Sequence, residues 1–301
     1  MNANPAIGWN VNKQVEDPFS ADVCCLVLDD GTYVLELKDR ILWSVAAFVG
    51  GDKAAFYHCG FFSSHNTLFD SKGRHYYHNC YIQGSIDFIF GRGQSIYHNE
   101  APTGIAYTSQ NQSVAAFVGG DKAAFYHCGF FSSHNTLFDS KGRHYYHNCY
   151  IQGSIDFIFG HGQSIYHECE IFVIANKRHE IQGSITAHSR QSTKENSGFV
   201  FVKGKVYGIG DVYLGRANGA YSRVVFANTY FSRTVIPQGW TNWSHSGSTG
   251  NLHQAEYKCH GPGSASTNRA TWSKQLTDKE AAPFLSLNFI KGKEWLPEWF
   301  F

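Results

Sequence analysis

One short motif occurs as YHC at residues 126–128, as YHNC at 146–149 and as YHEC at 166–169, and its spacing decides the fold. The motif returns at an almost constant interval, which its cysteines Cys128, Cys149 and Cys169 mark along the chain. Between them, short apolar runs are broken by Gly, Ser-Ser or Lys-Gly, which predicts short strands joined by turns. A period of about 20 residues is typical of a solenoid, and the sequence has neither a leucine-rich pattern nor a helical stripe. We therefore predict an all-β parallel β-solenoid in which each occurrence of the motif marks one coil of about 20–21 residues.

The same motif also occurs upstream, because residues 44–98 recur at 113–167. The two copies differ only at Arg92 and His161. Such close identity indicates either a very recent duplication or an error in assembling the gene, and both alternatives stay open. We expect three parts: a poorly defined, truncated N-terminal segment at 1–43, duplicated coils at 44–98, and the main β-helix domain at 100–301.

The composition fits a globular β protein. The 301 residues carry a net charge of +1, with 43% hydrophobic and 16% charged residues, which is enough apolar material for a core. The 30 Gly, 24 Phe and 17 Tyr favour strands and tight turns over helices. The near-zero charge gives no reason to expect nucleic acid or a membrane surface as a partner. The sequence contains no apolar run long enough to span a membrane, and its N-terminus shows no signal-peptide pattern.

Three further patterns predict local features. Residues 199–215 and 222–231 continue the strand pattern, and Thr277 with Glu280 forms a capping box that predicts a short C-terminal helix. The eight cysteines are too sparse for a disulfide framework. Because the histidines lack HxxxH spacing, we expect stacked ladders of imidazoles and no zinc site.

The solenoid period places two polar residues on neighbouring coils. Asn135 lies as far after Cys128 as Asp156 lies after Cys149. In-register coils would therefore stack these two side chains. Asp156 lies inside an apolar run, where a carboxylate is costly unless it is paired or used in chemistry. It either caps a turn or forms part of a site, and the pattern alone leaves both readings open.

GSIDFIFG at residues 153–160 resembles the Gly-x-x-Asp-Phe-Ile-Phe-Gly signature of plant-type pectin methylesterases (pectinesterases). Further segments resemble that family in the same order: QSVAA at 112–116, YLGR at 213–216, GPG at 261–263 and the C-terminal stretch 289–297. The resemblance covers roughly residues 100–299. It implies a right-handed parallel β-helix, which agrees with the solenoid predicted from the repeats.

The resemblance also implies an activity, which is hydrolysis of the methyl esters of pectin in the cell wall after secretion. Asp156 would be the nucleophile, Arg216 would orient its carboxylate, and Gln112 would help to bind the oxyanion. No metal and no organic cofactor are implied. The expected partners are methyl-esterified pectin and a proteinaceous pectinesterase inhibitor, with the protein a monomer.

Two departures from the family pattern concern the chemistry. Asn135 and His134 stand where the family has an acid–base Asp preceded by Gln, and Ala217 and Asn218 replace a Pro-Trp that packs against sugar. Because an amide does not titrate near neutral pH, we expect reduced activity. Because the Trp that packs against sugar is replaced, we expect weaker or altered sugar binding.

Three readings of the whole protein stay open. It is a weakened or inactive homologue that still binds pectin or another cell-wall carbohydrate, an active enzyme in which His134 carries the proton, or a non-functional product. Against the second reading, adjacent residues of a strand face opposite sides. The first copy is not expected to form a second active site, because Trp43 stands where the second copy has Gln112.

Overall fold

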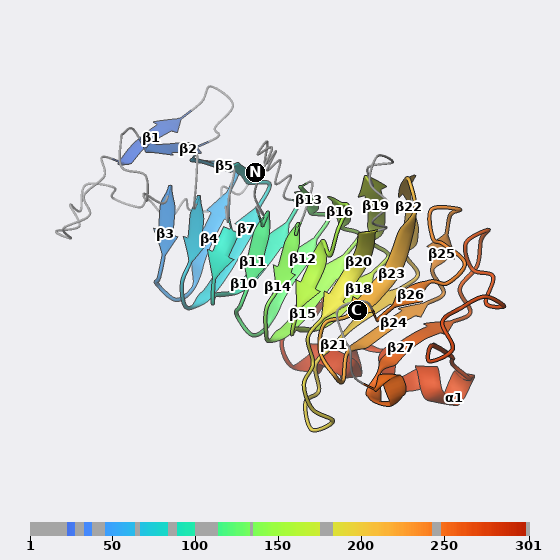
Figure 1. The fold of residues 1–301 in the computed structure, drawn as a ribbon. Helices are drawn as coiled ribbons and strands as arrows, with labels where there is room; N and C mark the ends of the chain where they lie inside the picture. The colour runs from blue at the N-terminus through green and yellow to red at the C-terminus, as the bar shows by residue number, and fades with distance from the viewer. Residues whose placement is uncertain are drawn as a thin grey trace.

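A computed structural model of the protein describes residues 23–27, 33–37, 46–63, 67–83, 89–99, 114–132, 135–174, 183–242 and 248–298 (Figure 1). In this part of the chain, successive coils stack side by side and their strands form long parallel sheets. The one antiparallel pair described joins β1 (Val23–Val27) to β2 (Tyr33–Leu37). The predicted all-β parallel β-helix is therefore confirmed.

The sheets form the sides of the stack. The ten-stranded sheet consists of β4 (Ala54–Tyr57), β7 (Arg74–His78), β10 (Gln94–His98), β12 (Ala123–Tyr126), β15 (Arg143–His147), β18 (Gln163–His167), β21 (Gly198–Val202), β24 (Arg223–Ala227), β27 (His253–Tyr257) and β28 (Lys274–Gln275). The nine-stranded sheet consists of β3 (Ala47–Val49), β6 (Leu68–Asp70), β9 (Ile89–Gly91), β11 (Ala116–Val118), β14 (Leu137–Asp139), β17 (Ile158–Gly160), β20 (Gly183–His188), β23 (Val212–Ala217) and β26 (Trp240–Thr241). A five-stranded sheet holds β13 (Gly129–Phe131), β16 (Tyr150–Gly153), β19 (Glu170–Ile174), β22 (Lys205–Ile209) and β25 (Tyr230–Phe231), and a four-stranded sheet joins β1 and β2 to β5 (Cys59–Phe62) and β8 (Tyr81–Gln83).

The first copy of the repeat extends the stack on its N-terminal side. It supplies β3 to β10, which form three successive sets of strands. Strand β10 pairs in parallel with β12, and Ala116 of β11 pairs with Ile89 of β9, so the two copies share continuous sheets. The predicted division of the whole chain into three parts remains a prediction.

The coil length is constant only within the copies. Strand β15 begins at Arg143 and β18 begins at Gln163, which is the interval that the motif predicts. The next two strands of the sheet, β21 and β24, begin at Gly198 and Arg223, so the coils that lead to them are longer. Because the extra residues lie between strands, the sheets stay in register while the period changes.

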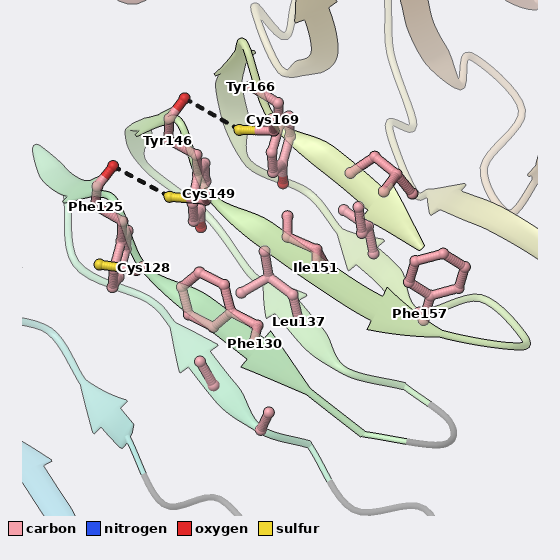
Figure 2. Close-up of a cluster of buried hydrophobic side chains, with 14 of the residues drawn as sticks. Phe125, Cys128, Phe130, Leu137, Tyr146, Cys149, Ile151, Phe157, Tyr166 and Cys169 are labelled. Carbon is pink, nitrogen blue, oxygen red and sulfur yellow. Dashed lines mark hydrogen bonds between the residues drawn. The ribbon is translucent and has the colours of Figure 1, made fainter. Parts of the chain in front are cut away.

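A ladder of aromatic rings fills the interior (Figure 2). Phe125 and Tyr146 stack with ring centroids 5.0 Å apart, and Tyr146 and Tyr166 stack at 4.5 Å. Beside the rings, Cys149 Sγ donates to the carbonyl of Phe125 at 3.4 Å. Stacking of offset rings adds about 0.5–1.5 kcal/mol per pair to the area that each ring buries. The repeated aromatic-His-Cys motif thus supplies one core layer per coil.

The turn after each strand of the ten-stranded sheet from β4 to β27 has a left-handed residue. Asn148 has φ +51° and Glu168 has φ +56°. The Asn148 N–H donates to the carbonyl of His167 at 3.0 Å, and the Glu168 N–H donates to that of Val202 at 2.8 Å. These bonds join each turn to the next coil, which keeps the strand ends aligned.

The C-terminal segment covers the outer face of the ten-stranded sheet. Helix α1 (Asp278–Ala281) begins at a capping box of Thr277 and Glu280, as predicted. Three 3₁₀ turns follow, η2 (Ala282–Phe284), η3 (Leu287–Ile290) and η4 (Gly292–Glu294), and a fourth, η1 (Thr249–Asn251), precedes β27. Ile290 and Leu296 belong to the same buried apolar cluster as Val200 and Val225 of the sheet.

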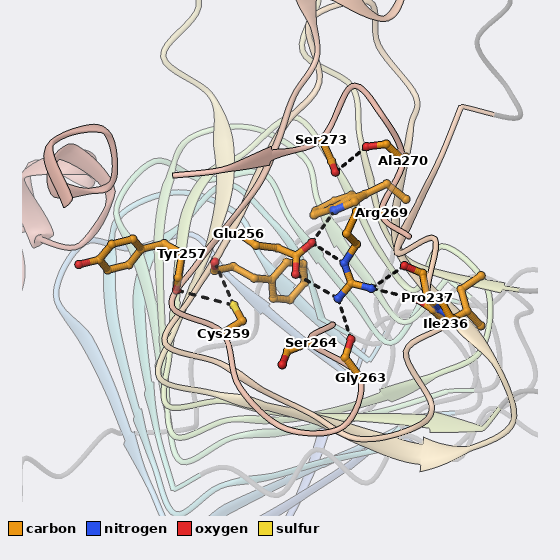
Figure 3. A network of polar contacts seen from close by, with 12 residues as sticks. Ile236, Pro237, Glu256, Tyr257, Cys259, Gly263, Ser264, Arg269, Ala270 and Ser273 are labelled. Atoms are coloured by element: carbon orange, nitrogen blue, oxygen red, sulfur yellow. Dashed lines mark hydrogen bonds and ion pairs between the residues drawn. The ribbon is translucent and has the colours of Figure 1, made fainter. Parts of the chain in front are cut away.

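A buried ion pair fixes the loops at the C-terminal end of the stack (Figure 3). Arg269 Nε donates to Glu256 Oε1 at 2.8 Å, and both side chains are at most 4% exposed. Arg269 also donates to the carbonyl of Pro237 at 2.8 Å, and Trp240 Nε1 donates to Glu256 Oε1 at 3.1 Å. The arginine thus links β27 to the loop before β26.

Candidate active site

Asp156 lies in the short connection between β16 and β17. Its backbone has φ +47°, a left-handed conformation that costs a non-glycine residue about 1–2 kcal/mol. Its N–H donates to the carbonyl of Ser184 in β20 at 2.6 Å. Such strained residues persist where the surrounding structure holds them, often at functional sites.

Arg216, near the end of β23, reaches the same carboxylate. Its Nε donates to Asp156 Oδ2 at 2.7 Å, and the two side chains are 16% and 13% exposed. The bond joins a guanidinium to a carboxylate in a partly buried place, and such hydrogen bonds are shorter and stronger than neutral ones. The structure therefore brings together two of the residues that the sequence singled out, Asp156 and Arg216.

Ser184 is a contact that the sequence did not reveal. Its hydroxyl donates to Asp156 Oδ1, the oxygen that Arg216 Nε does not contact, and Ser184 is fully buried. Along the chain, Ser184 follows Asp156 by more than one period of the motif. Because the coil between β17 and β20 is longer than the motif period, the period does not predict that Ser184 lies beside Asp156. That prediction requires the register of β20.

Asn135 occupies the equivalent place one coil earlier. Leu137 pairs with Ile158, so Asn135 and Asp156 stand at matching positions just before their strands, as the period predicted. Asn135 is half-buried, has φ +50°, and donates its N–H to the carbonyl of Ile155 at 3.4 Å. Adjacent coils are about 4.8 Å apart, so the amide stands where it could approach a group bound at Asp156.

The other predicted site residues cannot be placed. Gln112 and His134 lie outside the described residues. Their roles therefore stay predictions from the family resemblance.

Two glycines make room for the site. A Cβ on Gly153 would lie 2.7 Å from Thr136 Oγ1 and 2.3 Å from Phe157 Cβ. A Cβ on Gly215, beside Arg216, would lie 2.2 Å from Thr186 Oγ1. Close packing therefore requires glycine in both the GSIDFIFG and YLGR segments.

One aromatic surface, formed by Phe138 and Phe159, lies near the site, whereas the Trp that the family has after Arg216 is replaced by Asn218. Phe138 and Phe159 stack at 4.7 Å and are half-buried on strands β14 and β17, which follow Asn135 and Asp156. Asn218, which stands where the family has a sugar-packing Trp, accepts a bond from Arg216 Nη1 at 3.4 Å. Trp240 is fully buried and belongs to the core.

Metal-ligating groups gather elsewhere. Among the described residues, His147, His167 and Glu168 are the group of donors close enough to share an ion. They lie at the turn after the ten-stranded sheet, whereas Asp156 precedes a strand of the nine-stranded sheet.

Comparison with known sequences agrees with this arrangement. The pectinesterase family model matches residues 42–101 and 101–293. Probable pectinesterase 67 of Arabidopsis thaliana is 65% identical over 201 residues, which are 67% of this chain and 58% of the relative. Putative pectinesterase 11 of the same plant is 47% identical over 190 residues, 63% of this chain and 53% of the relative. The chain spans about half to three fifths of the length of these relatives.

Comparison with solved structures supports the fold. A pectin methylesterase from carrot aligns with a TM-score of 0.68 and 22% identity, covering 82% of this chain and 86% of the carrot protein. One from Aspergillus niger aligns with a TM-score of 0.63, 22% identity, and coverage of 81% and 87%. In the described part of the chain, every helix is too short or too polar to span a bilayer. Because the family model matches well over half of its residues, the chain belongs to the pectinesterase family.

Proposed function

We propose that this protein hydrolyses methyl esters of homogalacturonan, with Asp156 as the nucleophile. The observation that carries the proposal is the pair of contacts on the Asp156 carboxylate, one from Arg216 and one from Ser184. Both partners donate, so both carboxylate oxygens accept a hydrogen bond and the group has a fixed orientation. A carboxylate that is ionised and oriented is suited to attack on a carbonyl.

The proposed first step forms a covalent intermediate. One Asp156 oxygen bonds to the ester carbonyl carbon, and the tetrahedral intermediate collapses as the carbon–methoxide bond breaks. The products of this step are an acyl-enzyme anhydride and methanol, once methoxide has taken up a proton. Gln112 would donate to the oxyanion, in line with the family resemblance. Water then attacks the anhydride, which releases the free acid and regenerates the Asp156 carboxylate.

Both steps need a proton carrier, and Asn135 cannot serve. Its amide neither gives a proton to methoxide nor takes one from water at neutral pH. The proton must then come from solvent or from His134. Loss of general acid–base help costs about 10²–10⁴-fold in rate, so we expect slow hydrolysis.

The test is the release of methanol from methyl-esterified pectin by wild type and by Asp156→Asn. We expect Asp156→Asn to abolish release, because an amide is not a nucleophile toward esters. Asp87→Asn is the matched control, because Asp87 is the same residue in the first copy. Both variants are also made in an Asn135→Asp background, where rates are expected to be higher. If no protein in the set releases methanol, including Asn135→Asp, ester hydrolysis is not the function.

A second candidate function is pectin binding without catalysis, and Asn135 is the observation that favours it. The half-buried rings of Phe138 and Phe159 would still contact sugar. A binding protein would retain methyl-esterified pectin in a sedimentation assay, and Asn135→Asp would still release no methanol. An enzyme would show both binding and release.

The setting of the reaction is proposed from the family. We propose secretion to the plant cell wall, action as a monomer, and recognition by a proteinaceous inhibitor. Cell fractionation of tagged full-length protein tests the first of these proposals, since recovery in the cytosol alone would contradict it.

A further inference from the structure

Two histidines meet at the edge of the ten-stranded sheet. His147 ends β15, His167 ends β18, and the two are register partners on neighbouring coils. Their Nδ1 atoms lie 3.0 Å apart. In a neutral pair, one Nδ1–H donates to the other ring's Nδ1 lone pair, and the Tyr145 hydroxyl also lies 3.1 Å from His147 Nδ1. A metal ion would take the place of the shared proton.

A carboxylate completes the group. Glu168 follows His167 directly, and its Oε1 lies 3.8 Å from His167 Nε2. One donor atom from each of His147, His167 and Glu168 lies within 4.8 Å of the others. Two ligands about 2.0–2.1 Å from a tetrahedral ion are about 3.4 Å apart. His167 faces His147 with Nδ1 and Glu168 with Nε2, so binding of one ion by all three residues requires a rotation of the Glu168 side chain or of the His167 ring. Glu168 is 40% exposed, so it can rotate and an ion can enter from solvent.

We propose that His147, His167 and Glu168 bind a divalent zinc-type ion, with water as the fourth ligand. Two imidazoles and one carboxylate match the ligand preference of zinc, whereas calcium and magnesium prefer oxygen ligands alone. The sequence led us to expect no zinc site, because the two histidines are one whole coil apart and sequence rules for zinc consider only close spacings. In a solenoid, the coil period takes the place of such spacings.

The ion would close one coil of the stack. His147 stands at the start of the coil that holds Asp156, and His167 stands at its end. An ion that binds the folded protein and not the unfolded chain raises stability in proportion to the logarithm of its concentration over Kd. Zinc would thus link the turn at the start of the coil that contains Asp156 to the turn at its end.

Neighbouring groups set the strength of the site. Lys203 Nζ lies 3.9 Å from Glu168 Oε1, and the Tyr145 hydroxyl lies 3.1 Å from His147 Nδ1. The ammonium would repel the ion and compete for the carboxylate. We therefore expect Lys203→Met to bind zinc more tightly than wild type.

The first copy contains a natural control. His78 and His98 form the same pair, with their Nδ1 atoms 3.1 Å apart. Asn99 stands where the second copy has Glu168. The histidine pairs are equivalent, but the next coil places Lys203 beside Glu168 and Tyr126 beside His98. Exchange of Asn99 and Glu168 therefore tests the carboxylate in two different surroundings.

The test is calorimetric titration of ZnCl₂ into chelator-treated full-length protein. We expect one ion per wild-type chain, a loss of affinity of more than about 10–100-fold in Glu168→Asn, and two ions in Asn99→Glu. Asn is common in left-handed turns, so Glu168→Asn should fold as well as wild type. Its melting temperature in EDTA is therefore expected to match or exceed that of wild type.

The site would be overturned if wild-type protein bound no zinc, or bound MgCl₂ as tightly as ZnCl₂. It would also be overturned if zinc binding were unchanged in both Glu168→Asn and His167→Gln. An equal loss of zinc affinity in the control His98→Gln would likewise contradict the site and would place the ion on other histidines of the ladder.

Discussion

At the scale of single residues, Asp156 is fixed at three atoms by two partners. Its N–H donates to the Ser184 carbonyl, Oδ1 accepts from the Ser184 hydroxyl, and Oδ2 accepts from Arg216. The backbone of Asp156 is left-handed, a conformation that Asp adopts more readily than most non-glycine residues. The carboxylate is therefore oriented before any substrate arrives, which is the arrangement that favours a nucleophile.

Loss of the Ser184 hydroxyl should slow the chemical step. A hydrogen bond to a charged group is worth about 1.5–3 kcal/mol, so we expect Ser184→Ala to lower kcat for methanol release about 10- to 100-fold with little change in KM. Ser184→Cys keeps the size and a weak donor, so its loss should be smaller. A kcat of Ser184→Ala equal to that of wild type, with an unchanged melting temperature, would mean that the contact plays no part in the reaction.

The sequence predicts some of these residues and not others. Asp156 and Arg216 lie in long motifs, and Asn135 follows from a constant period. Ser184 could not be predicted, because residues added between β17 and β20 shift its position along the chain without shifting its register in the sheet. Sequence distance thus ceases to report spatial distance where the coil length changes.

At the scale of elements, a buried ion pair links β14 to β15. His144 Nδ1 lies 2.5 Å from Asp139 Oδ1, and its Nε2 lies 2.7 Å from the carbonyl of Gly120. Both ring nitrogens face acceptors, so both carry protons and the imidazole is positively charged. Burial alone would lower the pKa of His144, but the Asp139 carboxylate outweighs it and the pKa lies above its ordinary value. Burial alone would raise the pKa of Asp139, but His144 brings it below its ordinary value.

This pair makes stability depend on pH in a defined window. The pKa of His144 is raised on folding, so its contribution is complete below the unfolded value of about 6.5 and is lost as pH rises through the folded value. The pKa of Asp139 is lowered, so its contribution is complete above about 3.9 and is lost as pH falls through the folded value. The pair therefore stabilises most between about pH 4 and 6.5.

We expect His144→Gln to reduce the free energy of unfolding by about 3–5 kcal/mol at pH 6, because it leaves a buried carboxylate unpaired. The difference from wild type should shrink as pH rises toward 9. Urea unfolding at several pH values measures it. His75→Gln removes the equivalent imidazole of the first copy and serves as a comparison. A difference that grows with pH would contradict a charged His144.

Local sequence signals predict elements unevenly. The Thr277 and Glu280 capping box marked α1 because that signal depends only on neighbouring residues. The pairing of His147 with His167 depends on stacking between coils, so arguments about spacing along one strand missed it. Elements fixed by local bonds are predictable, whereas ladders across coils require the register.

At the scale of the whole molecule, the fold is a stack in which each coil contacts its neighbours. The period predicted this architecture, and the first copy joins it as further coils of the same kind. In such a stack, stability is close to a sum over coils and their interfaces. The extra coils are therefore separable from the site at Asp156.

Removal of residues 43–111 deletes one full period of the long repeat and keeps Gln112. We expect the shortened protein to fold and to release methanol at the rate of the full chain, because Asn135, Asp156 and Arg216 remain. The urea m-value should fall by about a quarter, in proportion to the surface lost. A folded but inactive deletion variant would show that the first copy takes part in the reaction.

The central claim is that Asp156 is a competent nucleophile and that the amide at position 135 limits the rate of ester hydrolysis. The most direct test compares initial rates of methanol release from methyl-esterified pectin for wild type, Asn135→Asp and the double variant Asn135→Asp with Asp156→Asn. We predict that Asn135→Asp is faster than wild type by about 10²–10⁴-fold, because it restores a proton carrier, and that the double variant is inactive. An Asn135→Asp protein that is no faster than wild type, or a double variant that keeps the gain, would contradict the claim.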